Sequence, residues 1–197
     1  MSNENLPAQN NNTGIAQQGE NDAIAQFRVN MQNFLTRLNA KPQQESIGKT
    51  SDGRASTILI SHVEMLLDEY FFGLWSTSNF KWSVITNEIV ASIDLLLTHP
   101  VSGKDFQRVG AAAVQIMVDK VPDSIKDKPV EKNRWALDPS NKKPGALDMG
   151  FPKLKAECIK NAANSLGKLF GRDLNRQQQD TYQPLFKERN TYNPQNQ

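Results

Sequence analysis

The chain contains a single cysteine, Cys158, and only two histidines among its 197 residues. One cysteine cannot close a disulfide within the chain, and neither His62 nor His99 stands at a zinc-ligand spacing from it, so a disulfide framework and a structural zinc site are excluded. No apolar run approaches the roughly 20 residues that cross a bilayer, and the polar N-terminus lacks the apolar core of a signal peptide. These absences predict a soluble protein of a reducing, intracellular compartment, with no membrane partner.

Patterns that carry covalent chemistry are also missing. Gly48-Lys49-Thr50 looks like the end of a phosphate-binding P-loop, but Gln43 occupies the place of the required first glycine, and Pro42 follows a predicted helix where a strand is needed. The carboxylates form no pair with the spacing of a metal site. We therefore expect no enzyme activity, no cofactor and no bound metal.

The charge is unevenly distributed. The net charge is +2, yet residues 1–26 contain Glu4, Glu20 and Asp22 and no lysine or arginine, so the remainder carries +5. A mildly basic domain is compatible with nucleic acid, although many other soluble proteins have a similar excess. Residues 1–21 and 176–197 are rich in Asn and Gln and have too few apolar groups to offset the entropy of ordering. They are predicted to be a disordered N-terminal tail and a flexible C-terminal tail around one domain, 22–175.

Hydrophobic spacing predicts two helices in the first part of this domain. Helical periodicity begins after Asp22, a plausible N-cap, and ends at Lys41-Pro42. A polar loop and a short β-prone run at 57–60 follow. The second helix is predicted to start at the capping-box spacing of Ser61 and Glu64 and to end at Gly73.

From Phe80 the apolar period changes to two, which predicts an antiparallel sheet of three to four strands. Its strands are expected around 80–84, with Trp82 in the core, at 89–97 and at 106–117. Residues 118–149 contain four prolines and many charges, and are predicted to form a long charged insert loop with no element of its own. This insert is either solvated or a loop that contacts nucleic acid, and we favour the solvated interpretation. Its Trp135 is expected to be either an exposed stacking platform or a local loop anchor.

The stretch from Gly150 to Asn175 is predicted to form one long helix with two chemically opposite faces. Its apolar arc comprises Cys158, Ile159, Ala162, Ala163, Leu166, Leu169 and Phe170, and its polar arc comprises Lys153, Glu157, Lys160, Asn161, Asn164 and Lys168. A solvated surface is the ordinary interpretation of such a polar arc. Three lysines against one glutamate, interleaved with amides, also suit a polyanion.

Three stretches, in this order, resemble the Rad-fifty-two superfamily of single-strand annealing proteins. Residues 58–85 carry His62, Phe72-Gly73 and Trp82; residues 90–114 form a hairpin that carries Arg108-Val109-Gly110; and residues 156–174 are AECIKNAANSLGKLFGRDL. The resemblance covers about 53–175. It implies an α+β fold in which a long helix packs on an antiparallel sheet as a β-β-β-α core, with an additional N-terminal helix.

The resemblance implies ATP-independent binding of single-stranded DNA and annealing of complementary strands in homologous recombination and DNA repair. It further implies a phage or mobile-element recombinase that acts in the cytoplasm of a bacterial host as a homo-oligomeric ring or helical filament. A phage exonuclease or a host single-strand-binding protein would be a natural partner. The alternative is a non-catalytic structural or regulatory module that uses the same fold to bind RNA or a protein.

Annealing requires cations that hold phosphates while the bases stay exposed. Many family members have a dense cluster of Lys and Arg on the last helix, whereas here Lys160 keeps one such place and Asn161 and Asn164 occupy others. For each candidate alone, a solvated surface group is an equally good interpretation. The candidates are Lys49 and Arg54 before the short strand, Lys104 and Arg108 on the hairpin, and Lys153, Lys160, Asn161, Asn164, Lys168 and Arg172 on the last helix.

Overall fold

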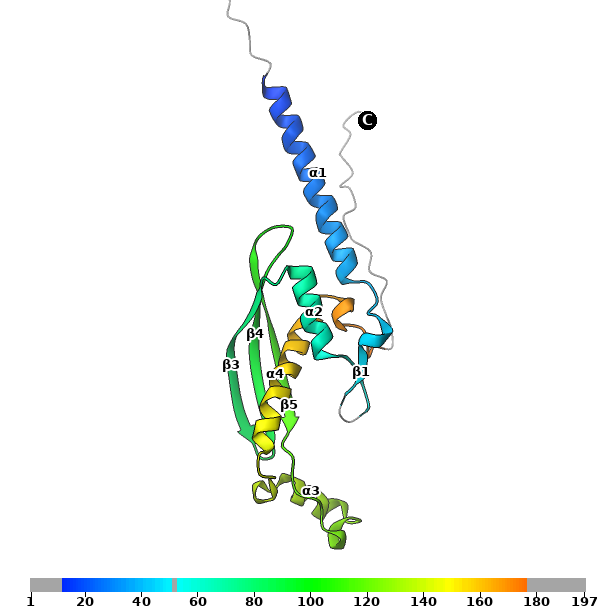
Figure 1. Ribbon diagram of the computed structural model, residues 1–197, viewed down its shortest axis with the longest axis vertical. Helices are drawn as coiled ribbons and strands as arrows, with labels where there is room; N and C mark the ends of the chain where they lie inside the picture. The colour runs from blue at the N-terminus through cyan, green and yellow to red at the C-terminus, as the bar shows by residue number, and fades with distance from the viewer. Residues whose placement is uncertain (1–11, 51–52, 177–197) are drawn as a thin grey trace, which may run out of the picture.

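Helix α4 (Ala146–Asn164) packs on one face of an antiparallel sheet and forms the core of the domain with it. In the computed structural model, which describes residues 12–50 and 53–176, the sheet has the order β3 (Trp75–Ile85), β4 (Glu88–Thr98) and β5 (Asp105–Gln115) (Figure 1). The predicted three-stranded meander and the α+β class are confirmed.

The alternating pattern of β4 explains why the helix packs here. Every second residue of this central strand is buried toward α4, and each buried aliphatic side chain contributes roughly 1.5–3 kcal/mol of transfer free energy. The buried β4 residues are Ile89, Ala91, Ile93, Leu95 and Leu97, and those of α4 include Leu154, Cys158, Ile159, Ala162 and Ala163. The Sγ atom of Cys158 lies 3.4 Å from the carbonyl oxygen of Ala91, which confirms that this cysteine is a core residue.

Among the residues that the structure describes, helix α1 (Asn12–Leu38) packs on the domain through its C-terminal end. Phe34 and Leu38 are buried, and the Phe34 ring meets Phe71 of helix α2 (Ile60–Phe71) edge to face at 5.8 Å. The other end of α1 extends beyond the rest of the domain (Figure 1). The predicted start at Asp22 is wrong, because the helix already includes residues 12–21 of the expected tail. Residues 1–11 and 177–197 of the two predicted tails lie outside the described residues.

Helix α2 begins without the predicted capping box. Its N-cap is Leu59, and no side chain caps it. At its other end Phe72 and Gly73 adopt positive φ angles of 56° and 68°, and the Gly73 N–H bonds to the carbonyl of Asp68 at 3.0 Å. The predicted stop at Gly73 is therefore confirmed.

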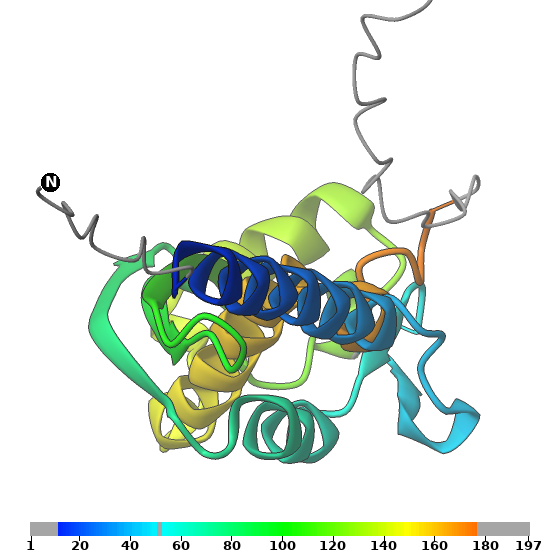
Figure 2. The same ribbon diagram turned by 90° about the horizontal axis from the view of Figure 1, so that it is seen from above.

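A second, two-stranded sheet pairs β1 (Ile47–Lys49) with β2 (Ser56–Ile58). Strand β2 matches the predicted β-prone run, but β1 lies in the segment predicted as loop, because three residues are too few for an alternation to be visible. The side chain of Asn175 holds the hairpin through two 2.8 Å bonds with the backbone N–H and C=O of Ser56. Figures 1 and 2 place this β1–β2 hairpin on the opposite side of α4 from β3.

The predicted long helix is shorter than expected. Helix α4 ends at Asn164, and the chain turns through Gly167 into the 3-10 turn η4 (Lys168–Phe170). Gly167 packs so closely on α1 that a Cβ atom there would overlap the carbonyl oxygen of Leu38. All seven residues of the predicted apolar arc are nevertheless buried.

Trp82 was expected in the core, and this prediction is wrong. It is 56% exposed, because α4 packs on β4 and β5 and leaves the edge strand β3 largely uncovered. The ring rests edge to face on Phe151, with 4.9 Å between centroids.

The insert at 118–149 contains a helix, α3 (Pro129–Leu137), which the sequence pattern did not predict because the helix buries none of its residues. Trp135 is a local anchor, since its indole N–H donates to the carbonyl of Asp119 at 3.2 Å. The buried side chain of Asn87, between β3 and β4, donates to the carbonyls of Ala136 and Asp138 and so fixes the end of α3 to the sheet. Within residues 12–50 and 53–176, no helix has the length and apolarity needed to cross a membrane.

Candidate nucleic-acid interface

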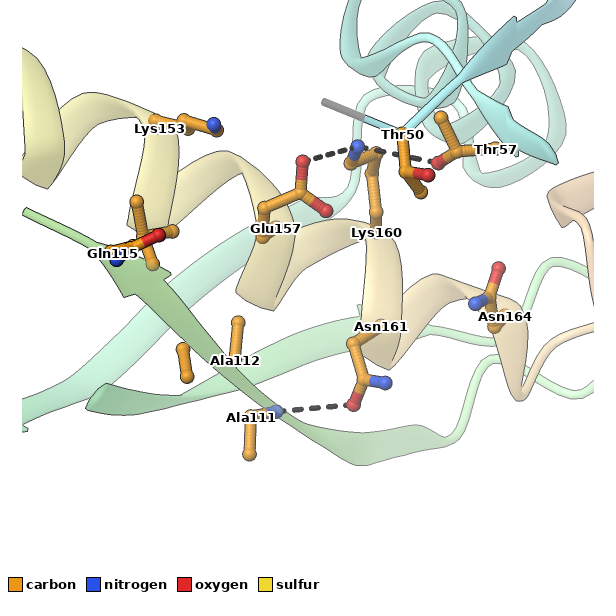
Figure 3. Close-up of a pocket in the computed structure, with 12 residues that line it drawn as sticks. Thr50, Thr57, Ala111, Ala112, Gln115, Lys153, Glu157, Lys160, Asn161 and Asn164 are labelled. Atoms are coloured by element: carbon orange, nitrogen blue, oxygen red, sulfur yellow. Dashed lines mark hydrogen bonds and ion pairs between the residues drawn. The ribbon is translucent and has the colours of Figure 1, made fainter. Parts of the chain in front are cut away.

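A polar groove of about 700 Å³ runs beside α4, between the free edge of β5 and the β1–β2 hairpin (Figure 3). Four of the ten predicted site residues line it from α4. The lining consists of Lys153, Glu157, Lys160, Asn161 and Asn164 of α4, residues 111–115 of β5, and Thr50 and Thr57 of the hairpin. The sequence analysis had selected the polar arc of the helix, but not the two threonines of the β1–β2 hairpin or the backbone of β5.

Lys160, at the centre of the groove, is already partnered. Its Nζ atom lies 2.6 Å from Oε1 of Glu157 and donates to Oγ1 of Thr57 at 3.3 Å, and its side chain is only 12% exposed. Figure 3 shows the ammonium between the carboxylate and the threonine hydroxyl. Lys160 thus links α4 to β2, and its positive charge is balanced before any ligand arrives.

Asn161 binds the free edge of the sheet. Its Oδ1 atom accepts a hydrogen bond from the backbone N–H of Ala111 at 3.1 Å (Figure 3). In an antiparallel edge strand alternate residues direct their backbone groups away from the sheet, so Ala113 and Gln115 point the same way as Ala111. Their N–H groups are donors suited to phosphate oxygens, with the small alanine side chains leaving the backbone accessible.

Lys153 and Asn164 lie at the two ends of the groove, about 16 Å apart along the helix axis at 1.5 Å per residue. Lys153 is exposed, and within the described residues its ammonium makes no ion pair. The side-chain amide of Asn164 likewise makes no hydrogen bond to a described residue. These two side chains and the amide of Gln115 are the side-chain groups of the groove wall that are available to a ligand, beside the outward N–H groups of β5.

Lys168 and Arg172 hold the end of α4 together. Lys168 pairs with the buried carboxylate of Asp173 at 3.1 Å. The guanidinium of Arg172 donates to the carbonyls of Asn164 and Ser165, which the end of the helix leaves unpaired. The helix ends before both residues, so the prediction that they lie on it is wrong, and Lys168 does not belong to its polar arc.

The remaining four candidates lie outside the groove lining. Lys49 and Arg54 are exposed on the β1–β2 hairpin, where Lys49 donates to Oγ of Ser56 at 3.3 Å. Lys104 and Arg108 line a separate depression near the C-terminal end of α1, together with His99. The guanidinium of Arg108 stacks over Phe106 at 5.0 Å from the ring centroid.

The charge of the groove lining is small. Two lysines face one glutamate, which leaves a single net positive charge, and the hairpin adds two further cations outside the lining. None of the lysines of the insert lines the groove. The arrangement suits weak binding of an extended anionic chain more than tight capture of one compact anion.

The described residues hold no cluster of three or more His, Cys, Asp or Glu side chains that could bind a metal ion. Burial raises the pKa of the Cys158 thiol, a backbone hydrogen bond from Ala112 opposes the shift, and the nearby charge of Glu157 adds to it. A buried thiol of this kind is a poor nucleophile.

A scan against protein-family models and a search among curated proteins both return no match. The resemblance to the single-strand annealing proteins therefore depends on the residues quoted above. The structure explains one of these residues. Gly110 stands where α4 crosses β5, and a side chain at this position would overlap the helix backbone.

Proposed function

We propose that this protein binds single-stranded DNA along the groove and anneals complementary strands without ATP hydrolysis, as a non-enzymatic recombination and repair protein. The observation that carries the proposal is the convergence of Lys153, Lys160, Asn161 and Asn164 on one open groove beside a free strand edge. Helical phase had selected the same four residues, and the family resemblance had selected Lys160, Asn161 and Asn164 among them.

The groove would act by holding the backbone of one strand. Lys153 supplies an unpaired cation, the outward N–H groups of β5 supply neutral donors, and the amides of Gln115 and Asn164 add adaptable hydrogen bonds. The groups on the wall suit phosphate and sugar, so the bases would face outward and remain free to pair.

One subunit with so few phosphate contacts would hold a strand weakly, and we propose that homo-oligomerisation into a ring or filament supplies a continuous track. The free edge of β3, with Trp82 and Val84 exposed, and the protruding part of α1, with Ile24 and Phe27 exposed, are surfaces that could contact a second copy. A phage or mobile-element origin, a bacterial cytoplasm, and a partner exonuclease or host single-strand-binding protein belong to the same proposal.

The proposal is tested with labelled oligonucleotides. Fluorescence anisotropy should show preference for single strands, with log affinity falling against log salt at a slope of about −3 to −4 if about four to six phosphates are neutralised. Complementary oligonucleotides should anneal faster with the protein, equally with and without ATP. A flat salt response, equal affinity for duplex, or a strict monomer by light scattering with and without DNA would contradict it.

The alternative is a module that binds RNA or a protein. One observation favours a protein partner: the central cation of the groove is already neutralised by Glu157, which weakens the attraction of the groove for any nucleic acid. The same anisotropy experiment with an RNA oligonucleotide of equal sequence separates the two nucleic acids. Tighter binding of RNA without acceleration of annealing would support the alternative.

A further inference from the structure

Glu157 is the single acidic side chain among the described residues that line the groove. It lies one helical turn from both Lys153 and Lys160, on the surface where a bound phosphate backbone would run (Figure 3). A carboxylate is unfavourable in a site for a polyanion. Its place there therefore needs an explanation in terms of either structure or function.

We propose that Glu157 limits the affinity of the groove for single-stranded DNA and thereby keeps a bound strand exchangeable, an inference that rests on the proposed function. The Glu157 side chain is 37% exposed, so its charge reaches the groove. Through the 2.6 Å contact it also holds the Lys160 ammonium, which is 12% exposed, away from an incoming phosphate. A phosphate must compete with the carboxylate for Lys160 and is repelled by it.

Weak binding of the strand is useful for annealing. A strand that has found its complement must leave the phosphate contacts as the duplex forms, and each additional neutralised phosphate slows that release. Because Glu157 neutralises Lys160, the groove holds the strand through fewer positive charges. Glu157 thus determines how tightly the strand is held.

The test is Glu157→Gln, which keeps the size of the side chain and removes the charge. Glu131→Gln is the matched control, because Glu131 also pairs with a lysine three residues away, Lys128, at 3.5 Å, but lies on α3 outside the groove. Anisotropy with an oligo-dT should show about threefold to tenfold tighter binding for Glu157→Gln and a steeper salt slope. Strand annealing at saturating protein should be slower than wild type, and Glu131→Gln should match wild type in both assays.

A second variant, Glu157→Ala, should change affinity in the same direction, and thermal melting should confirm that all variants fold. If the wild-type protein binds the oligonucleotide and neither Glu157 variant binds it more tightly, Glu157 serves only to position Lys160 and this inference is overturned alone. If the wild type and all variants fail to bind, the proposed function fails, and the inference fails with it.

Discussion

Gly110 of β5 lies directly against the backbone of Cys158 in α4. A Cβ atom at position 110 would overlap the carbonyl oxygen of Cys158 and come within 2.7 Å of the backbone nitrogen of Ala162. Both are backbone atoms, so neither can move unless α4 shifts or bends. The closeness of α4 to β5, which also places Asn161 within reach of the Ala111 N–H, therefore depends on the absence of a side chain at this position.

The first prediction follows from this contact. Gly110→Ala should destabilise the fold by about 1–3 kcal/mol or more, because the added methyl group forces α4 away from the sheet. Urea unfolding measures the loss. Ala113→Ser, a change on the exposed side of the same strand, should stay within about 0.5 kcal/mol of wild type. Equal stability of the two variants would show that the helix can shift freely.

Leu154→Ala should remove about 2–5 kcal/mol from the free energy of unfolding. The Leu154 side chain is fully buried between α4 and the sheet, and its truncation leaves a cavity that the surrounding core fills only in part. The midpoint of denaturant unfolding should fall while the m-value stays unchanged. A loss below about 1 kcal/mol would mean that the helix does not pack on the sheet as described.

Substitution of Lys153, the neighbour of Leu154 in sequence, should change DNA binding and leave the stability unchanged. Lys153→Ala removes an exposed, unpaired cation at the end of the groove, so it should weaken single-strand binding and reduce the magnitude of the salt slope by about 0.7 while leaving the melting temperature unchanged. Lys155→Ala is the control, because Lys155 is exposed on the same helix but does not line the groove. Identical binding of the two variants would place the DNA elsewhere.

Stability should fall as the pH drops below about 6.5, partly through His99. Burial lowers the pKa of this imidazole, which packs between Phe34 and Phe106 and accepts the backbone N–H groups of Val101 and Ser102 at Nδ1. A lowered pKa means that the unfolded chain binds the proton first, so acid favours unfolding. Lys104, Asp105 and Arg108 line the same depression.

The variant His99→Asn tests this, since its Oδ1 atom can still accept the two N–H groups but does not titrate. The drop in melting temperature between pH 7.5 and pH 5 should be smaller in the variant than in wild type. An identical drop in both proteins would assign the acid sensitivity to other groups.

Much of the fold could be predicted because its elements carry long, regular patterns. The alternation of β4 and the apolar arc of the last helix each extend over several turns or pleats, and both are buried as predicted. Shorter or less regular patterns did not predict the elements that the structure has. Strand β1 has three residues, α3 buries no side chain, and residues 12–21 of α1 contain Asn, Thr and two glycines, whose low helix propensity gave no signal of a helix.

The candidate site was predicted only in part for a related reason. The phase of the helix placed Lys153, Lys160, Asn161 and Asn164 on one face, and that face does line the groove. The helical phase could not show that the helix ends at Asn164. Because it ends there, Lys168 and Arg172 lie beyond the helix and stabilise its C-terminal end.

The sequence by itself determined the class of the fold, the buried face of α4 and the polar residues on its other face, because side-chain direction in a helix or strand follows from local geometry alone. Only the tertiary structure decided what these polar residues meet. Thr57 is 103 residues from Lys160, and Ala111 is 50 residues from Asn161. Such contacts depend on how separate elements pack, and no local periodicity encodes that Glu157 balances the central lysine in the space between a strand edge and a distant hairpin.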